Sequence, residues 1–578
     1  MSPSSRLPLT PRLGPLPAGM PGVAALLLLC AIVLLAPASL HPGALFSGSD
    51  VYPDGQGTFW HHWLFHTEGL LGESHTRLQM YPHVVDEVVL GGFPLDAMAS
   101  WPFALIFGWP RGYGIFQVAS LWGAGLAMAW LAGRWWRSPA AALIAGVAYE
   151  ASAPLLRELA YGRSTQVFGA IFVPLALGWF ARAVVEGRPR DAMLAGLASA
   201  GCALAYWYHG LFCVLGLLVI AALAWWEGLP APRTLLLTLG TLGIVCLLPA
   251  AYTFGQLGQV GGVRTTLYST IHFGEFDMRL VDLLEERDLT STLNEGSAGL
   301  LPVLYGLAVL GILRERPRRW LAPLVWTLGG GLLALGPVLA WVGPLPLPGP
   351  FGLFSLVPVL RRMWWPDRAL LLVAPGIALL AGGGAAHLLS RLPVGGAIQR
   401  RVPALLAPTL LAASLLVEAW LVLPTLPMPT TSAVPSARAE AIAQGTGPLL
   451  VLPQPIGPYL LGSTIRLDQV FHRRPLVNGL MPPGDATAPA SYRDFSMFPA
   501  MAHLYGCAVT PTPFTSDAAA AILPLRRLGI TEVVVDVEML TAAEADVDRY
   551  VSCVTSVLGP PVEDRGPYRV WGLPPALP

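Results

Sequence analysis

The residues GVAALLLLCAIVLLAPASL (22–40) form an uncharged apolar run, and the acidic, aromatic segment SGSDVYPDGQGTFWHHW (47–63) follows shortly after it. A helix that crosses a bilayer needs about 20 such apolar residues. We expect a retained span, although Arg6 and Arg12 ahead of the run would also suit a cleaved signal peptide. The acidic segment then opens an extramembrane loop at the membrane surface.

The composition agrees with a membrane protein. Of 578 residues, 54% are hydrophobic and only 12% are charged, and the mean hydropathy is +0.58. All 35 basic residues are Arg, which excludes mechanisms that need a P-loop, Schiff-base or protein-kinase lysine. The zero net charge and the lack of a basic run argue against nucleic acid as a partner.

Ten further apolar runs follow, so we predict a polytopic α-helical membrane domain over 1–424. The eleven expected spans lie near 22–40, 113–133, 139–155, 166–184, 191–208, 210–227, 234–254, 297–313, 320–342, 368–390 and 402–424. Arginines concentrate in the short loops on one side, which predicts a cytoplasmic N-terminus and a large first outer loop over 41–112. An odd number of spans places the C-terminal residues outside as well.

The C-terminal region has a different character. A Pro- and Thr-rich linker over 425–435 precedes a predicted small α/β domain over 436–578. The expected strands are 449–452, 532–537 and 568–573, and the expected helices lie near 435–444, 516–528 and 541–557. Cys507 and Cys553 could pair there in an oxidising compartment, but the six cysteines lack zinc-ligand spacing, so we expect no structural metal site.

The first outer loop holds the strongest candidates for catalysis. Its acids include Asp50, Asp54, Asp86, Glu87 and Asp96, and its aromatic residues include Trp60 and Tyr81. An acid at the membrane surface could act as a general base toward a hydroxyl group or bind a divalent ion, and aromatic rings could stack on a sugar. The alternative is a solvated loop with an interfacial aromatic belt. His62 and His66 share one helix face, but without a third ligand they indicate a metal site only weakly.

Two further clusters flank later spans. Arg157, Glu158, Tyr161 and Arg163 follow the third span, where ionisable side chains either line a polar site or pair with each other. The arginines 361, 362 and 368 precede the tenth span, and the planar guanidinium group matches phosphate oxygens, whether of a substrate or of ordinary membrane lipids. His209, between two predicted spans, has no assigned role.

The order of these parts resembles the GT-C superfamily of membrane glycosyltransferases, and more narrowly its bacterial GT-C-like members. The matching features are Asp54 followed by Phe59 and Trp60, a turn over 92–94, a small-residue span over 140–153, Gly162 with Arg163, and Pro366 with Arg368. In the terminal region, DQVFHRRPLVNG (468–479) and LGITEVVVD (528–536) are similar to that group's terminal domain.

The resemblance implies an enzyme of the bacterial cytoplasmic (inner) membrane. It would transfer a sugar from a polyprenyl-phosphate donor to a glycan, lipid or protein acceptor on the outer face. Asp54 or Asp50 would be the base or metal-binding acid, helped by Asp86 or Glu87, with Mg²⁺ or Mn²⁺ as the cation.

The other clusters receive binding roles in this hypothesis. Donor phosphate would bind Arg361, Arg362, Arg368 and Arg163, and the sugar or acceptor would contact Trp60, Tyr81, Arg157, Glu158 and Tyr161. The alternatives are a transporter or flippase for lipid-linked substrates and a membrane scaffold without catalysis.

Overall fold

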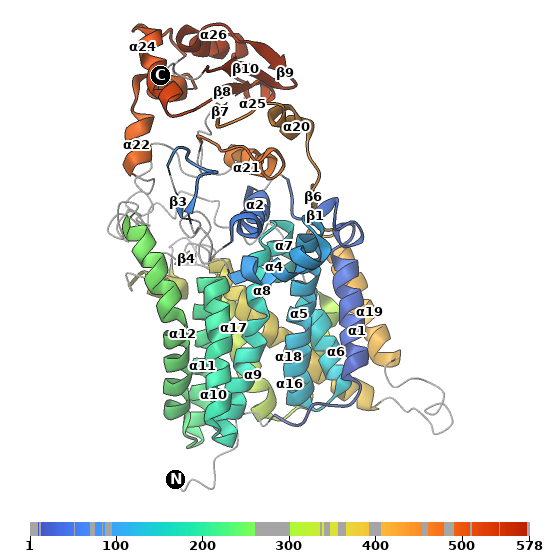
Figure 1. Ribbon diagram of the computed structural model, residues 1–578. Helices are drawn as coiled ribbons and strands as arrows, with labels where there is room; N and C mark the ends of the chain where they lie inside the picture. The colour runs from blue at the N-terminus through green and yellow to red at the C-terminus, as the bar shows by residue number, and fades with distance from the viewer. Residues whose placement is uncertain are drawn as a thin grey trace.

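The computed structural model shows a helical bundle at one end of the molecule and a mixed α/β region at the other (Figure 1). The helix α2 and the strand pair β1–β6 lie between the two. The structure describes residues 10, 13–50, 53–69, 75–83, 85–86, 95–259, 301–335, 338–339, 347–356, 366–391, 406–453, 460–478, 490–508, 511–542 and 544–574.

Six helical stretches among these residues are long and apolar enough to cross a membrane. They are Arg111–Trp136, Pro139–Ala160, Ser164–Glu186, Trp207–Trp226, Ala231–Tyr252 and Pro366–Arg391, and four shorter apolar helices are Met20–Leu34, Leu95–Phe107, Pro302–Arg314 and Leu406–Val422. The protein is therefore an integral membrane protein with several apolar helices, whereas the count of eleven spans stays a prediction.

The helices of the bundle follow the predicted spans closely. They are α1 (Met20–Leu34), α5 (Arg111–Trp136), α6 (Pro139–Glu150), α7 (Ala153–Ala160), α8 (Ser164–Ala170), α9 (Phe172–Glu186), α10 (Pro189–Ala205), α11 (Trp207–Trp226), α12 (Ala231–Gln259), α16 (Pro302–Arg314), α17 (Pro317–Ala334), η6 (Pro366–Ala369), α18 (Leu370–Arg391) and α19 (Leu406–Val422).

One helix boundary in the bundle differs from the predicted one, and the difference concerns two charged residues of the candidate site. The third apolar stretch does not end near 155 but continues through α7 to Ala160, so Arg157 and Glu158 lie on a buried helix. Charged residues are tolerated at such a depth only when they are paired. Their pairing, described below, explains why the helix can continue.

The first loop contains the short elements η2 (Ala38–Leu40), β1 (Leu45–Ser47), α2 (Pro53–Glu68), β2 (His75–Thr76), β3 (Val85–Asp86) and α4 (Leu95–Phe107). Strand β1 pairs antiparallel with β6 (Thr430–Ser432). The segment predicted as a plain linker, 425–435, therefore contains a strand that holds the C-terminal region against the first loop. Both regions lie at the same end of the bundle, in agreement with the odd number of predicted spans.

The C-terminal region contains a four-stranded sheet in the order β7-β8-β10-β9. Strands β7 (Leu449–Leu452) and β8 (Glu532–Asp536) are parallel, and β10 (Tyr568–Gly572) pairs antiparallel with β8 and with β9 (Glu563–Arg565). The helices of this region are α20 (Ala437–Ala443), α21 (Leu460–His472), α22 (Ala490–Ser496), α23 (Pro499–Gly506), α24 (Ala518–Arg527), α25 (Val537–Ala542) and α26 (Val547–Leu558). The predicted mixed α/β region is confirmed, and its three expected strands are β7, β8 and β10.

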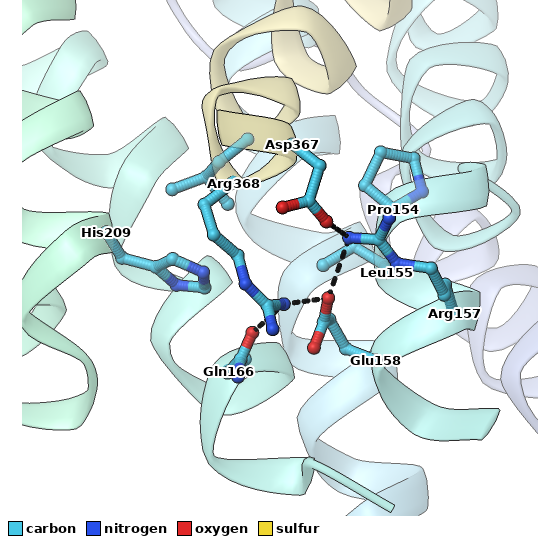
Figure 2. Close-up of a pocket in the computed structure, with 9 residues that line it drawn as sticks. Pro154, Leu155, Arg157, Glu158, Gln166, His209, Asp367 and Arg368 are labelled. Atoms are coloured by element: carbon cyan, nitrogen blue, oxygen red, sulfur yellow. Dashed lines mark hydrogen bonds and ion pairs between the residues drawn. The ribbon is translucent and has the colours of Figure 1, made fainter. Parts of the chain in front are cut away.

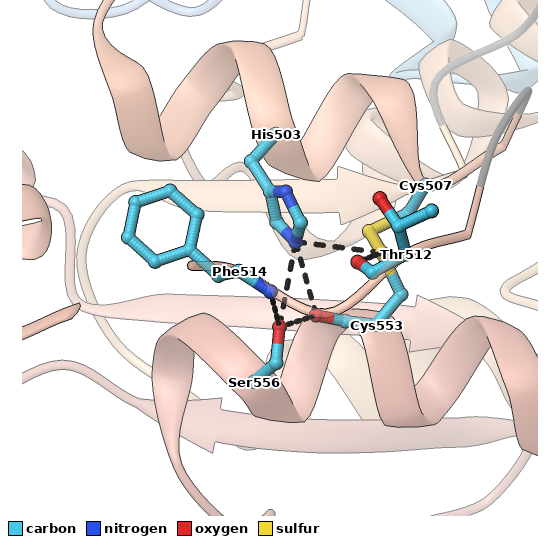
Figure 3. Close-up of a disulfide and its surroundings, with 6 residues drawn as sticks. All are labelled: His503, Cys507, Thr512, Phe514, Cys553 and Ser556. Carbon is cyan, nitrogen blue, oxygen red and sulfur yellow. Dashed lines mark hydrogen bonds between the residues drawn. A yellow bond between two sulfur atoms is a disulfide. The ribbon is translucent and has the colours of Figure 1, made fainter. Parts of the chain in front are cut away.

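Cys507 and Cys553 form a disulfide with a Cα–Cα distance of 5.9 Å, so the open question of their pairing is answered (Figure 3). The bond joins the end of α23 to α26. Both sulfur atoms lie in the hydrophobic core of the C-terminal region.

Candidate active site at the membrane end of the first loop

Three glycines bring the first loop onto the turn between α7 and α8. Gly162 has φ +72°, and a Cβ atom added there would lie 2.2 Å from the Cα of Gly55. A Cβ atom added at Gly48 would lie 2.8 Å from the Cα of Gly162. The backbone N–H of Ser49 donates to the carbonyl of Ala160 at 2.8 Å. No residue with a side chain fits this approach.

This contact places Asp54, in the first turn of α2, beside Arg163. The Arg163 Nε donates to Asp54 Oδ2 at 2.6 Å, and the Asp54 side chain keeps 40% of its surface exposed. Burial alone would lower the pKa of Arg163, but the charges of Glu158 and Asp54 raise it above its ordinary value. Arg163 also lies 4.9 Å over the Tyr161 ring. The most accessible acid of this site is therefore held by a permanently charged arginine.

Arg163 also belongs to a group of charged side chains, here called the Glu158 cluster and made up of Arg157, Glu158, Arg163, Asp367 and Arg368. Figure 2 shows the four buried members, which are Arg157, Glu158, Asp367 and Arg368. Glu158 Oε1 contacts Arg157 Nη2 at 3.1 Å and also pairs with Arg368, while Oε2 contacts Arg163 Nη1 at 3.3 Å. Arg157 pairs in addition with Asp367. One carboxylate thus serves three guanidinium groups.

The Glu158 cluster borders a small cavity that also touches His209 and Gln166 (Figure 2). The cavity has about 20 Å³, which is room for a single water molecule. His209 is buried, and its Nδ1 has no hydrogen-bond partner in the described part of the chain. Gln166 accepts a hydrogen bond from Arg368. A larger ligand would have to displace these side chains from one another.

A second polar network fixes the rest of the first loop. His62 on α2 contacts Ser100 through Nδ1 at 2.7 Å and Asp96 through Nε2 at 3.0 Å. Thr165 on α8 donates to the same Asp96 oxygen. Burial would raise the pKa of Asp96, but the neighbouring His62 outweighs it and holds this pKa well below the ordinary range. Both His62 nitrogens are thus used within the protein, which leaves neither for a metal shared with His66.

The remaining predicted site residues are distributed unevenly. Asp50 is exposed on the same loop as Asp54, and Asp86 lies in β3. Glu87, Arg361 and Arg362 lie outside the described residues. Among the predicted site residues that the structure describes, Asp54, Arg157, Glu158, Tyr161, Arg163 and Arg368 are brought together, and their roles stay predictions.

Trp60 and Tyr81 face the C-terminal region instead of the Glu158 cluster. Trp60 is only 1% exposed, and its indole N–H donates to Gln469 Oε1 on α21 at 2.8 Å. The Tyr81 hydroxyl donates to the Leu528 carbonyl at 3.0 Å. Their contacts tie the first loop to that region, and this burial of the Trp60 ring leaves little face for a sugar.

One set of metal-type side chains does gather, although the sequence spacing gave no sign of it. His503, Cys507 and Cys553 have ligand atoms within 4.8 Å of one another. The two sulfur atoms are bonded to each other, however, and His503 Nε2 lies 3.4 Å from Ser556 Oγ (Figure 3). In this structure the set is a disulfide with a neighbouring imidazole.

Several residues at the site were not identified as site residues from the sequence. Asp367 stands next to Arg368, and an acid beside an arginine at the start of an apolar run was a usable signal. Asp96 and His62 were named as residues of the first loop, but their pairing was not expected. His209 and Arg466 of α21 gave no such signal, because each meets its neighbours only through long-range packing.

Comparison with known proteins gives similarity of structure only. No protein-family model matches the chain, and no curated protein is significantly similar to it in sequence. Among solved structures, apo ArnT from Cupriavidus metallidurans has 15% identity and a TM-score of 0.50, with 96% of this chain and 97% of that chain covered. ArnT bound to undecaprenyl phosphate gives 14% identity and a TM-score of 0.46 over 96% and 97% of the two chains.

Two other solved proteins also align with most of the chain. The arabinofuranosyltransferase AftD from Mycobacteria has 16% identity and a TM-score of 0.49, covering 91% of this chain and 37% of its own. The oligosaccharyltransferase AglB from Archaeoglobus fulgidus has 12% identity and a TM-score of 0.48, covering 93% of this chain and 71% of its own. The alignment with apo ArnT shows that this chain has the same fold as ArnT over most of its length.

Proposed function

We propose that the protein transfers a sugar from a polyprenyl-phosphate donor to a hydroxyl group of a glycan, lipid or protein acceptor. The observation that carries this proposal is the link from the accessible acid Asp54 through Arg163 and Glu158 to Arg368. An acid that can accept a proton and arginines that can hold a phosphate thus belong to one connected site in a GT-C fold.

The chemistry follows from the two kinds of group. Asp54 accepts the proton of the acceptor hydroxyl as its oxygen forms a bond to the anomeric carbon of the donor. The bond from that carbon to the phosphate oxygen breaks, and the lipid phosphate leaves with the electron pair. Arg163 and Arg368 stabilise the negative charge that develops there. Asp54 later releases the proton to water.

Donor binding requires the Glu158 cluster to open. Its cavity holds no more than a water molecule, and the arginines already contact carboxylates. A phosphate would therefore exchange with Asp54 or Glu158 for the guanidinium groups. ArnT, which shares this fold, has been solved with undecaprenyl phosphate bound, and we infer a ligand of the same class here.

A divalent cation remains a weaker part of the hypothesis. The archaeal oligosaccharyltransferase has been solved with zinc and sulfate. In this chain the described acids near the site, Asp54, Glu158 and Asp367, are all paired with arginines, and no three metal ligands gather there within the described ranges. These residues do not fit a cation site, so the proposed steps use none.

The side of the membrane belongs to the proposal as well. The first loop and the C-terminal region share one end of the bundle, and the arginine-rich short loops favour the other end as cytoplasmic. The site would then lie on the outer face of a bacterial inner membrane, in contact with membrane lipids.

The decisive experiment measures transfer by the purified full-length protein in lipid nanodiscs. A panel of radiolabelled undecaprenyl-phosphate-linked hexoses and pentoses is supplied with a membrane extract that lacks the protein. We expect label transfer and release of undecaprenyl phosphate, and a loss of about 100-fold or more in Asp54→Asn. Asp564→Asn is the matched control, because the Asp564 side chain is 72% exposed in the C-terminal region. Transfer at the wild-type rate in both Asp54→Asn and Asp50→Asn would contradict the assignment, and absence of transfer from every donor would count against the reaction.

A further inference from the structure

Arg466 reaches from the C-terminal region to the acid of the candidate site. It lies on α21, which packs along α2, and its guanidinium group lies 6.0 Å over the Trp60 ring. A Cβ atom added at Gly57 would lie 3.2 Å from both of its terminal nitrogens. Gly57 follows Asp54 by three residues, so the two lie on the same face of α2. The space left by a glycine therefore holds the Arg466 side chain close to Asp54.

Two arginines from different elements act on Asp54. Arg163 donates a hydrogen bond to its carboxylate at 2.6 Å. The charge of Asp54 also acts on Arg466, where it partly offsets the effect of burial, which lowers the pKa of Arg466 to about 10. The Asp54 carboxylate therefore lies near two guanidinium groups, one from the turn before α8 and one from α21.

We propose that Arg466 is an anion-binding residue of this site, through which the C-terminal region contacts the phosphate group of the donor. The inference rests on the proposed function and extends it to a region that the sequence did not connect with the site. A guanidinium group offers two parallel N–H donors that match two phosphate oxygens. The phosphate would lie between Arg163 and Arg466 and take over the place that Asp54 holds between them.

In this arrangement, binding of the donor phosphate determines whether Asp54 can accept a proton. Asp54 contacts Arg163 in the structure, and a phosphate that binds Arg163 in its place releases the carboxylate. The released carboxylate is then free to accept a proton. The base would therefore become available only when the donor is in place.

The test is a binding measurement on the full-length protein in nanodiscs. Undecaprenyl phosphate, inorganic phosphate and uncharged undecaprenol are titrated against the wild type, Arg466→Gln and Gly57→Ala. We expect Arg466→Gln to weaken binding of undecaprenyl phosphate by about tenfold and to leave undecaprenol unchanged. Gly57→Ala should give a smaller loss in the same direction, because its methyl group displaces the guanidinium while all charges stay.

Arg473→Gln serves as the matched control, since Arg473 is exposed just after the same helix. Wild-type affinity in Arg466→Gln, an equal loss toward undecaprenol, or no binding of either phosphate by the wild type would overturn the inference. Binding of inorganic phosphate as tight as that of the lipid would keep the anion site and assign it to a soluble ligand. If the wild type transfers no sugar but Arg466→Gln binds undecaprenyl phosphate more weakly, only the proposed function is refuted. If the wild type transfers sugar and Arg466→Gln binds undecaprenyl phosphate as tightly as the wild type, only this inference is refuted.

Discussion

Two buried clusters of arginine and carboxylate lie in different regions of this protein. In the Glu158 cluster of the bundle, one glutamate is shared by three guanidinium groups. In the C-terminal region, Arg438 of α20 pairs with Asp536 at the end of β8 and lies 3.6 Å from Asp468 of α21. We call these last three residues the Arg438 cluster.

The difference between the two clusters is which partner is in excess. The Glu158 cluster contains three arginines and two carboxylates, and arginines cannot lose their charge, so the cluster attracts a further anion, which in this structure is the Asp54 carboxylate. Surplus carboxyl groups can take up protons instead, and burial raises the pKa of Asp468 to about 6 and also raises that of Asp536. A buried cluster rich in arginine is therefore suited to bind a ligand, whereas one rich in acid responds to pH.

The largest effect expected from this comparison is that of Glu158→Gln. The substitution leaves three guanidinium groups, two of them buried, short of their shared partner, and breaking a buried pair costs about 3–5 kcal/mol. The apparent melting temperature of the detergent-purified protein, measured at one heating rate, should fall sharply. If the variant melts at the wild-type temperature, the fold does not need Glu158 to balance the three arginines, and the difference drawn between the Glu158 cluster and the Arg438 cluster would be wrong.

A smaller and opposite effect is expected for Asp468→Asn. The pKa of Asp468 rises from an ordinary value of 3.8 to about 6 on folding, so the native state retains a proton in this range that the unfolded chain loses. Stability therefore falls as the pH rises through this window and stays lower above it. Asparagine cannot lose that proton and still accepts the hydrogen bond of the Ser436 hydroxyl.

The variant should therefore be more stable than the wild type above about pH 6, by roughly 2 kcal/mol, and equal to it below about pH 4. Thermal unfolding of both proteins between these limits measures the difference. A gain that is the same at every pH would mean that the pKa of Asp468 is the same in the native and the unfolded state.

The smallest effect is expected at an exposed ion pair. Glu186 contacts Arg188 at 3.0 Å and Arg182 at 3.4 Å, and the side chains of Arg188 and Glu186 are 62% and 30% exposed. Because water and salt screen such a pair, Glu186→Gln should change stability by about 0.5 kcal/mol or less. A loss comparable to that of Glu158→Gln would show that burial is not what separates these pairs.

The sequence predicted the regular elements well because they depend on local patterns. The uncharged run that forms α1 and the strands β7, β8 and β10 are visible in the order of apolar residues. The paired cysteines could be named as candidates only. Their contact joins α23 to α26, and no local pattern reports such a distance.

The candidate site was predicted in part. Asp54, Arg163 and Arg368 were singled out because ionisable residues beside apolar spans are unusual, and they do belong to one network. Trp60 was expected to meet a sugar, and the structure instead buries it against Gln469. An aromatic residue in an acidic loop has the same neighbours along the sequence whether its ring contacts a sugar or packs against another part of the protein.

The sequence by itself determined that this chain lies in a membrane, where its apolar runs fall, and that its cations are all arginines, because composition and periodicity are properties of neighbouring residues. Only the tertiary structure decided that Gly48, Gly55 and Gly162 meet and that Glu158 is shared by three guanidinium groups. It also decided that Arg466 reaches Asp54 from a distant helix. These contacts join residues far apart along the chain, and only the packing of the bundle, the first loop and the C-terminal region brings their charges within reach of one another.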